Sequence, residues 1–213
     1  MISVASRGPG AKPNARMSDL ILQTALRLFT QQGYVATSIE QVAAACGCGK
    51  HTVYRRHPNK QALFAAVVDL QSDKLSNRIG ALPIAGGDPL ATLKALCLDV
   101  LEVYTTPEFI DFHRMCIAEA RSQVEIRPIL GRNNALLVET GERLVREAQA
   151  SGQMRAGDPG FLMRQLAQAA LHYPLDELLL CQPEFQTTEA RRDYFEQGWT
   201  LFFEGAAPRV GHV

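Results

Sequence analysis

Apolar residues recur three or four positions apart along most of this chain, and proline or glycine separates one such segment from the next. Ile21, Ala25, Leu28 and Phe29 show this spacing near the N-terminus, and the spacing places all of them on one face of a helix. No segment shows the alternation of apolar and polar residues that is typical of a half-buried strand. The sequence therefore predicts an all-α protein.

Turn-forming residues divide the N-terminal part into short helices. Gly33 follows the first apolar segment and can take the left-handed conformation that often ends a helix. Two short helices are expected at 37–46 and 50–56, with Gly47 in the turn between them and Pro58 after the second. Two short helices joined by a tight turn are typical of a helix-turn-helix motif.

The segment from Gly80 to Asp88 is the clearest break in the pattern, and longer helices are expected after it. They are predicted at about 88–106, 107–123, 128–151, 158–182 and from 187 onward, and Pro174 could kink the fourth. The expected parts are a flexible basic arm at 1–16, a three-helix, homeodomain-like helix-turn-helix domain at 17–62 and a helical domain at 63–208, with residues 60–79 as the connecting helix.

Basic side chains are concentrated in the first 60 residues. That segment holds eight Lys or Arg and two Asp or Glu, although the whole chain has 22 of each kind. The asymmetry favours a module that binds a polyanion, joined to a body that does not. A chance asymmetry on a solvated face is the alternative.

Composition also bears on the compartment. No apolar run approaches the ~20 residues that a membrane span needs, and residues 1–16 lack the apolar core of a secretory signal. The five cysteines show no framework spacing, which favours a reducing environment. We therefore expect a cytoplasmic protein that does not associate with membranes.

Residues 21–67 contain many specific positions in a fixed order. They are ILQTALRLF at 21–29, Gly33-Tyr34, TSIEQVA at 37–43, Gly47, Lys50, Thr52, Tyr54 and NKQALF at 59–64. This series resembles the signature of the TetR family of transcriptional regulators, and the helical remainder is similar to that family in layout only. The resemblance implies a homodimer that binds a palindromic operator in double-stranded DNA and is released by an unknown small-molecule inducer. It also implies that the connecting helix transmits the change.

The second short helix carries the candidate DNA contacts. The N-terminal residues of a recognition helix reach base edges in the major groove, and here they are Gly49, Lys50 and His51. Hydroxyl groups suit phosphate oxygens, which position a protein without specifying sequence. The resemblance implies contacts from Thr37, Lys50, His51, Thr52, Tyr54 and Lys60, and Arg55 and Arg56 are further candidate phosphate partners.

Three residues depart from the family pattern. Gly49 replaces the usual Ser or Thr, so the recognition helix loses a side-chain cap at a cost of only a few tenths of a kcal/mol. His51 replaces a residue that is commonly small, which should change the base preference. His57 stands where an aromatic residue is usual, and we expect it to pack as one.

Two further sets of residues are candidates in the C-terminal part. Aromatic, soft and polar side chains suited to a pocket between helices are Tyr104, Phe109, Phe112, His113, Cys116, Phe161, His172 and Tyr173. Apolar side chains that a two-subunit four-helix bundle would bury are Leu171, Leu175, Leu178, Leu179, Phe195, Trp199 and Phe202. For both sets, burial in the core of one chain is the alternative.

The sequence offers no catalytic constellation, so we expect no enzymatic activity and no cofactor. The spacing of Cys46, Cys48, His51 and His57 matches no common zinc pattern, so no metal is expected. A redox role for the two cysteines depends on their thiol pKa values and exposure. The alternative functions are a DNA-binding activator or architectural protein without an inducer and, third, a helical enzyme or carrier.

Overall fold

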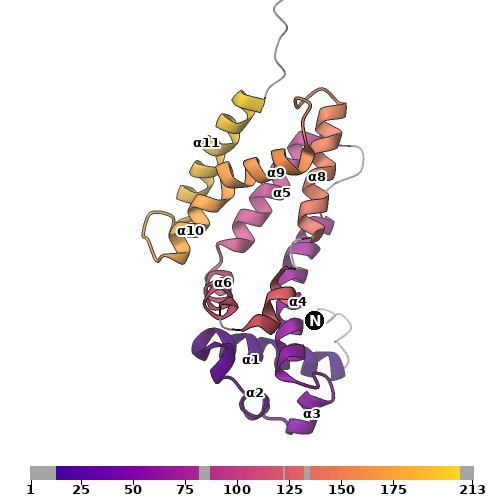
Figure 1. Cartoon of the computed structure of the whole chain (residues 1–213), viewed down its shortest axis with the longest axis vertical. Coiled ribbons are helices and arrows are strands. Elements are labelled where there is room, and N and C mark those ends of the chain that lie inside the picture. Colours follow the sequence, from indigo (N-terminus) through magenta and orange to yellow (C-terminus); the bar gives the residue numbers. More distant parts are fainter. Residues whose placement is uncertain (1–12, 82–86, 122, 132–134, 207–213) are drawn as a thin grey trace, which may run out of the picture. The chain divides into compact units, whose positions relative to one another are not determined.

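The computed structural model describes residues 13–81, 87–121, 123–131 and 135–206. Within these ranges the chain is a succession of helices with no strand, which confirms the predicted fold class (Figure 1). The chain divides into two units, 1–68 and 69–213, and the division falls inside helix α4 (Lys60–Ala81). None of the described helices has the length and apolar character needed to cross a membrane.

The first unit contains α1 (Pro13–Ala36), α2 (Ile39–Ala45), α3 (Lys50–Tyr54) and the beginning of α4. Gly33 interrupts α1 with a φ of 87°, as its place in the sequence predicted. Residues 13–16 were expected to belong to a flexible arm, but they are helical, because the first helix starts at Pro13. The prediction is therefore wrong for this part of the arm. Residues 1–12 of the arm lie outside the described residues.

Three aromatic rings form the centre of this unit. The ring centroids of Phe29, Tyr34 and Phe64 lie 5.0–5.7 Å apart, and two of the three pairs meet edge to face. Val42 from α2 and Val53 from α3 are fully buried. Each short helix therefore contributes one apolar face to a core that holds it in place, although α3 alone is too short to be stable.

The second unit consists of the rest of α4 and a series of helices with some short irregular turns. They are α5 (Pro89–Tyr104), α6 (Pro107–Ala120), η1 (Val124–Ile126), α7 (Arg127–Gly131), α8 (Ala135–Ala150), α9 (Pro159–Ala167), η2 (Gln168–His172), α10 (Tyr173–Leu179) and α11 (Thr188–Ala206). A proline opens α5, α6 and α9, and the side chain of Asp88, Thr106 or Asp158 before it accepts a backbone N–H bond.

The predicted helix at 158–182 is divided by a π-helical turn, η2, between α9 and α10. Pro174 accounts for the division, since it has no N–H to donate and its ring crowds the carbonyl group of Ala170 four residues earlier. A widened turn is one way in which a helix absorbs such a proline.

Helix α11 runs beside α9 and η2 (yellow against orange in Figure 1). Gly198 makes this approach possible, because a Cβ atom at this position would lie 2.3 Å from the carbonyl oxygen of Ala169. Leu96, Leu144, Leu166 and Phe195 belong to the apolar core that α5, α8, α9 and α11 share.

Candidate nucleic-acid interface and ligand cavity

The start of α2 is fixed by a reciprocal pair of hydrogen bonds. The hydroxyl of Ser38 accepts the backbone N–H of Gln41 at 3.1 Å, and the side chain of Gln41 accepts the backbone N–H of Ser38 at 2.7 Å. Thr37 does not share this role. Thr37 is 2% exposed, and its hydroxyl donates to the carbonyl of Gly33 at 2.8 Å and accepts from Gln32 at 3.2 Å. The expected phosphate contact of the Thr37 hydroxyl is therefore corrected, since the group is buried and bonded internally.

The turn into α3 depends on two glycines. Gly47 has a φ of 67°, which L side chains rarely adopt. Gly49 is the N-cap of α3, and no side chain caps this helix. A Cβ atom on Gly49 would lie 2.6 Å from Cε1 of His51. The imidazole therefore occupies the space that a capping side chain would need, so the two departures from the family pattern are linked.

Helix α3 presents its first residues to solvent. Lys50, His51 and Arg55 are exposed, and Thr52 is half-buried. The exposed Tyr54 hydroxyl donates to Oε1 of Glu40 at 3.0 Å rather than standing free. A backbone hydrogen bond and this phenol hold the pKa of Glu40 below its usual range, and the carboxylate raises the pKa of Tyr54. Tyr54 must exchange this partner to contact a phosphate.

Two of the candidate basic residues also hold the first unit together. Arg56 donates from Nε to the Ser18 hydroxyl at 3.1 Å and from a guanidinium nitrogen to the carbonyl of Thr52 at 2.8 Å. Lys60 donates to the carbonyls of Tyr34 and Val35 at 3.0 and 3.1 Å. An ammonium group has three donors, so Lys60 keeps one for a phosphate.

The other polar residues near α3 fit a packing role. Burial, and next the charge of Arg56, lowers the pKa of His57, so a neutral imidazole packs there, in line with its expected role. Burial raises the pKa of the Cys48 thiol, and this disfavours the thiolate on which redox chemistry depends.

The second unit contains a cavity of about 330 Å³ between α5, α8, α9, η2 and α10. Most of its lining is apolar, and the lining residues are Val100, Leu101, Tyr104, Thr105, Leu137, Val138, Gly160, Met163, Arg164, Ala167, Gln168, Leu171, His172 and Leu175. Such a volume and composition are those of a small-molecule site.

Of the eight residues expected to line a pocket, only Tyr104 and His172 line this cavity. Phe109 stacks on Tyr104 with a centroid distance of 4.3 Å, and His113 meets Phe109 edge to face at 5.7 Å, so both lie behind the wall. The prediction is wrong for the remaining four as well, because they do not line the cavity. Phe112 and Cys116 are buried away from the cavity, and Phe161 and Tyr173 are largely exposed.

Four of the lining residues that the sequence did not predict share one feature. Arg164, Gln168, Leu171 and Leu175 lie one helical turn apart on the same stretch of chain as His172. Positions three and four residues from a given side chain share its helix face, so His172 could have identified Gln168 and Leu175, but not its direct neighbour Leu171.

Two imidazoles in this region have an unsatisfied nitrogen. Nδ1 of His113 and Nδ1 of His172 are buried and have no hydrogen-bond partner among the described residues. Burial lowers the pKa of His113, with a smaller lowering from His172 and an opposing effect from Asp176. Burial also raises the pKa of Tyr104 to about 12. The phenol thus stays neutral beside the cavity.

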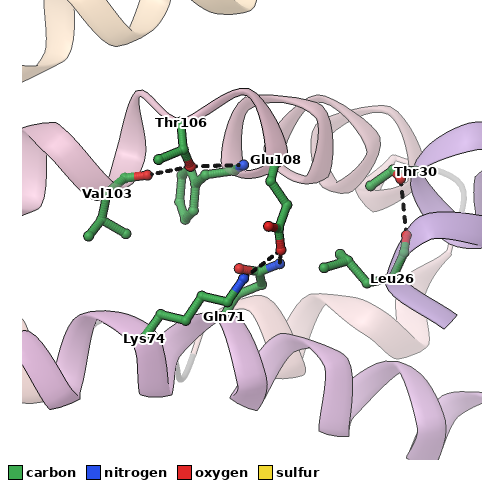
Figure 2. A network of polar contacts seen from close by, with 8 residues as sticks. Leu26, Thr30, Gln71, Lys74, Val103, Thr106 and Glu108 are labelled. Carbon is green, nitrogen blue, oxygen red and sulfur yellow. Dashed lines mark hydrogen bonds and ion pairs between the residues drawn. The ribbon is translucent and has the colours of Figure 1, made fainter. Parts of the chain in front are cut away.

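A polar network links α6 to α4 within the second unit (Figure 2). Oε1 of Glu108 accepts from Gln71 at 3.0 Å and from Lys74 at 2.5 Å. Burial opposes ionisation, but these two donors hold the pKa of Glu108 below its usual value. Thr106 caps the same first turn of α6, directly after Tyr104 and Thr105 of the cavity wall.

Most side chains expected at a subunit interface are buried inside the single chain. Phe195 is 0% exposed, and Leu171, Leu175, Leu178 and Trp199 are also buried. Leu171, Phe195 and Trp199 belong to the core that α11 shares with α9 and η2, whereas Leu175 and Leu178 pack with Ile110 and Phe185. This corrects the prediction for these five, because the same chain covers them. Leu179 and Phe202 are half-buried, and Leu180 and Leu201 on the same helices are exposed.

Comparison with known proteins covers both units. The family description "Bacterial regulatory proteins, tetR family" matches residues 21–67. The description "AefR-like transcriptional repressor, C-terminal domain" matches residues 91–205, which is more than half of the chain.

Curated relatives match mainly the N-terminal part. The transcriptional regulator AcrR of Shigella flexneri is 36% identical over 93 residues, which are 41% of this chain and 41% of that protein. The transcriptional repressor ComR of Escherichia coli (strain K12) is 38% identical over 71 residues, which are 33% of this chain and 32% of that protein. The match thus spans less than half the length of either relative.

Solved structures match nearly the whole chain. The Flavonoid-responsive Regulator FrrA superimposes with a TM-score of 0.72 at 25% identity, over 92% of this chain and 100% of the other. The likeness in fold therefore includes the unit that contains the cavity.

Proposed function

We propose, because this chain belongs to the TetR family of bacterial regulatory proteins, that it represses transcription as a dimer and that a small molecule releases it from DNA. Its DNA target would be a palindromic operator read by two copies of α3 in successive major grooves. A repressor acts where the chromosome lies, so the proposal places the protein in the cytoplasm.

The observation that carries the proposal is the exposed N-terminal end of α3. Lys50 and His51 stand on a short helix that Val53 anchors in the core, so their side chains are presented by a rigid support. Lys50 can donate to O6 and N7 of guanine, and the exposed Arg55 fits a phosphate contact.

The cavity supports a ligand-responsive role. Its wall includes Tyr104 and Thr105 at the end of α5, and the next helix holds α4 through Glu108. A ligand that fits the cavity better in one arrangement of this wall would shift α6, and Glu108 would transmit the shift to α4. Helix α4 continues along the chain to Lys60 at the DNA-binding unit.

The proposed dimer contact lies on the last helices, as the resemblance to the family implies, and the exposed apolar side chains there support it. Leu201 on α11 is 70% exposed, and Leu180, directly after α10, is 67% exposed. Together with the half-buried Leu179 and Phe202, they could be covered by the same residues of a second copy.

Titration of operator and random duplexes with salt tests the assignment. Lys50→Ala should reduce the discrimination between the two duplexes by about 1–3 kcal/mol. Arg55→Ala should weaken both duplexes alike and flatten the salt dependence by about one unit. Arg55 serves this comparison better than Lys60, because the Lys60 ammonium also bonds two carbonyls in the fold and its loss would affect stability as well.

Identical behaviour of the two variants would contradict the roles given to Lys50 and Arg55. Wild-type protein that binds random duplex as tightly as any selected fragment would instead support an architectural protein. A monomeric mass by light scattering at micromolar concentration would exclude the symmetric arrangement.

A further inference from the structure

We propose that the cavity of the second unit binds a neutral or anionic aromatic compound of about two or three rings whose phenolic hydroxyl hydrogen-bonds to His172. This inference rests on the proposed function, because it names the chemical class of the inducer. Three features of the cavity lead to it, namely its volume, the charge of its lining and an unsatisfied nitrogen in its wall.

The volume limits the size of the ligand. Filling a cavity of 330 Å³ at the packing density of a protein interior takes a molecule of roughly 250 Å³. That size corresponds to a compound with two or three rings, and a large peptide or a long acyl chain would exceed it.

The lining selects for aromatic surface. Most of the wall is aliphatic, and Tyr104 adds a ring that is held in place by its stacking on Phe109, with planes only 8° apart. Met163 adds a thioether, which makes favourable contacts with aromatic edges. A rigid aromatic compound would bury its surface here and lose little conformational freedom.

The charge of the lining excludes cations. None of the described lining residues is Asp or Glu, and the one charged side chain among them is Arg164. The Arg164 side chain is 69% exposed, so it lies toward solvent rather than deep in the cavity. The carboxylate of Glu142, which lies beside Gly160 of the wall, is paired with Arg146 at 3.6 Å. A buried cation would therefore have no free counter-charge among these residues, whereas a neutral or anionic compound meets no repulsion.

The unsatisfied nitrogen gives the ligand its polar anchor. Nδ1 of His172 is buried without a partner among the described residues, and His172 lines the cavity within the π-helical turn. Nδ1 has almost no accessible surface, so it reaches the cavity only when the imidazole turns about its Cβ–Cγ bond. A hydroxyl both donates and accepts, so it can then pair with Nδ1 in either imidazole tautomer. An apolar compound of the same shape would leave this nitrogen unsatisfied.

Calorimetric titration with matched probes tests the proposal on the wild-type protein. The probes are flavone, its 6-, 7- and 4′-hydroxy derivatives, and the cation 9-aminoacridine, which has three rings. We expect the best hydroxyflavone to bind about tenfold tighter than flavone, and 9-aminoacridine to bind more weakly than either. Equal binding of flavone and all hydroxyflavones, tightest binding of the cation, or no binding of any probe would overturn the proposal.

Variants of His172 locate the anchor. In His172→Leu the preference for the hydroxyl should fall to about twofold or less, whereas His172→Asn keeps a polar atom near the position of Nδ1 and should retain much of the preference. Tyr173→Phe is the matched control, because this neighbour is exposed and does not line the cavity. A full preference in His172→Leu would overturn the assignment of His172, and the wild-type titration decides the ligand class if this variant does not fold.

The two proposals fail in distinguishable ways. Operator binding by the protein without any probe decides whether it is a DNA-binding regulator, and the probe titration without DNA decides the ligand class. Protein that selects a DNA fragment but shows no preference for a hydroxyl would retain the proposed function and lose only this inference.

Discussion

Gly198→Ala should destabilise the second unit through a single added carbon atom. The new Cβ would lie 2.3 Å from the carbonyl oxygen of Ala169 and 3.0 Å from the Ala169 carbonyl carbon and the Ala170 Cα, whereas ordinary contacts begin near 3.4 Å. These are backbone atoms of the π-helical turn, so no side chain can rotate away. The overlap between this Cβ and the carbonyl oxygen therefore requires helix α11 or the turn to move by roughly an ångström.

The magnitude follows from two opposing effects. Inserting a methyl group into a packed interior costs about 1–3 kcal/mol, and the rigid neighbours here favour the upper part of that range. Alanine is favoured over glycine within a helix by about 1 kcal/mol. The free energy of unfolding should consequently fall by about 1–2 kcal/mol.

Gly141→Ala is the matched control, since it is also a buried glycine within a helix. Its Cβ would lie 2.8 Å from Sδ of Met163, and this flexible side chain can adjust. We expect its stability to stay within about 1 kcal/mol of wild type.

Urea unfolding followed by the fluorescence of Trp199, the single tryptophan, measures both variants in the core that they affect. Equal protein concentrations are needed, because the stability of the proposed dimer depends on concentration. If Gly198→Ala is as stable as Gly141→Ala, the close approach of α11 to the turn is not what requires glycine.

Two further predictions concern the polar groups of the second unit. A double-mutant cycle of Lys74→Met and Glu108→Gln should give a coupling of about 0.5–1 kcal/mol in urea unfolding, because both side chains are partly exposed, and a coupling of zero would remove the proposed link between α4 and α6. Burial holds the pKa of His113 below its ordinary 6.5, so on acidification the unfolded chain takes up this proton before the folded chain does. The stability that depends on the neutral imidazole is therefore present above pH 6.5 and is lost as the pH falls below that value. The difference in unfolding free energy between about pH 7.5 and about pH 5.5 should therefore be smaller in His113→Leu than in wild type, and an unchanged difference would mean that His113 is not the responsible group.

Local signals made much of the fold predictable. Asp88-Pro89, Thr106-Pro107 and Asp158-Pro159 each combine a capping side chain with a proline, and each opens a helix at the predicted place. The break at Gly33 and the turn at Gly47 could equally be predicted, because glycine takes a positive φ more readily than any other residue.

The candidate sites were predicted unequally. Lys50 and His51 are exposed on α3 as expected, since a short helix after a tight turn has one apolar face and leaves its first residues outward. The Thr37 hydroxyl was expected to face a phosphate, but a hydroxyl at a helix start can face either way, and the carbonyl of Gly33 and the amide of Gln32 decided its direction.

The sequence by itself determined where the helices that open with a capping residue and a proline begin, which helix faces are apolar and that the N-terminal part is a helix-turn-helix, because these properties depend on neighbours within a few residues. Only the tertiary structure decided what covers each apolar face. Phe195 and Leu175 had the pattern of an interface yet are covered by their own chain, and Tyr104 and His172 line a cavity while Phe112 does not. Helical periodicity fixes the direction in which a side chain points on its own helix, but whether it meets core, cavity or a second subunit depends on helices distant in the sequence.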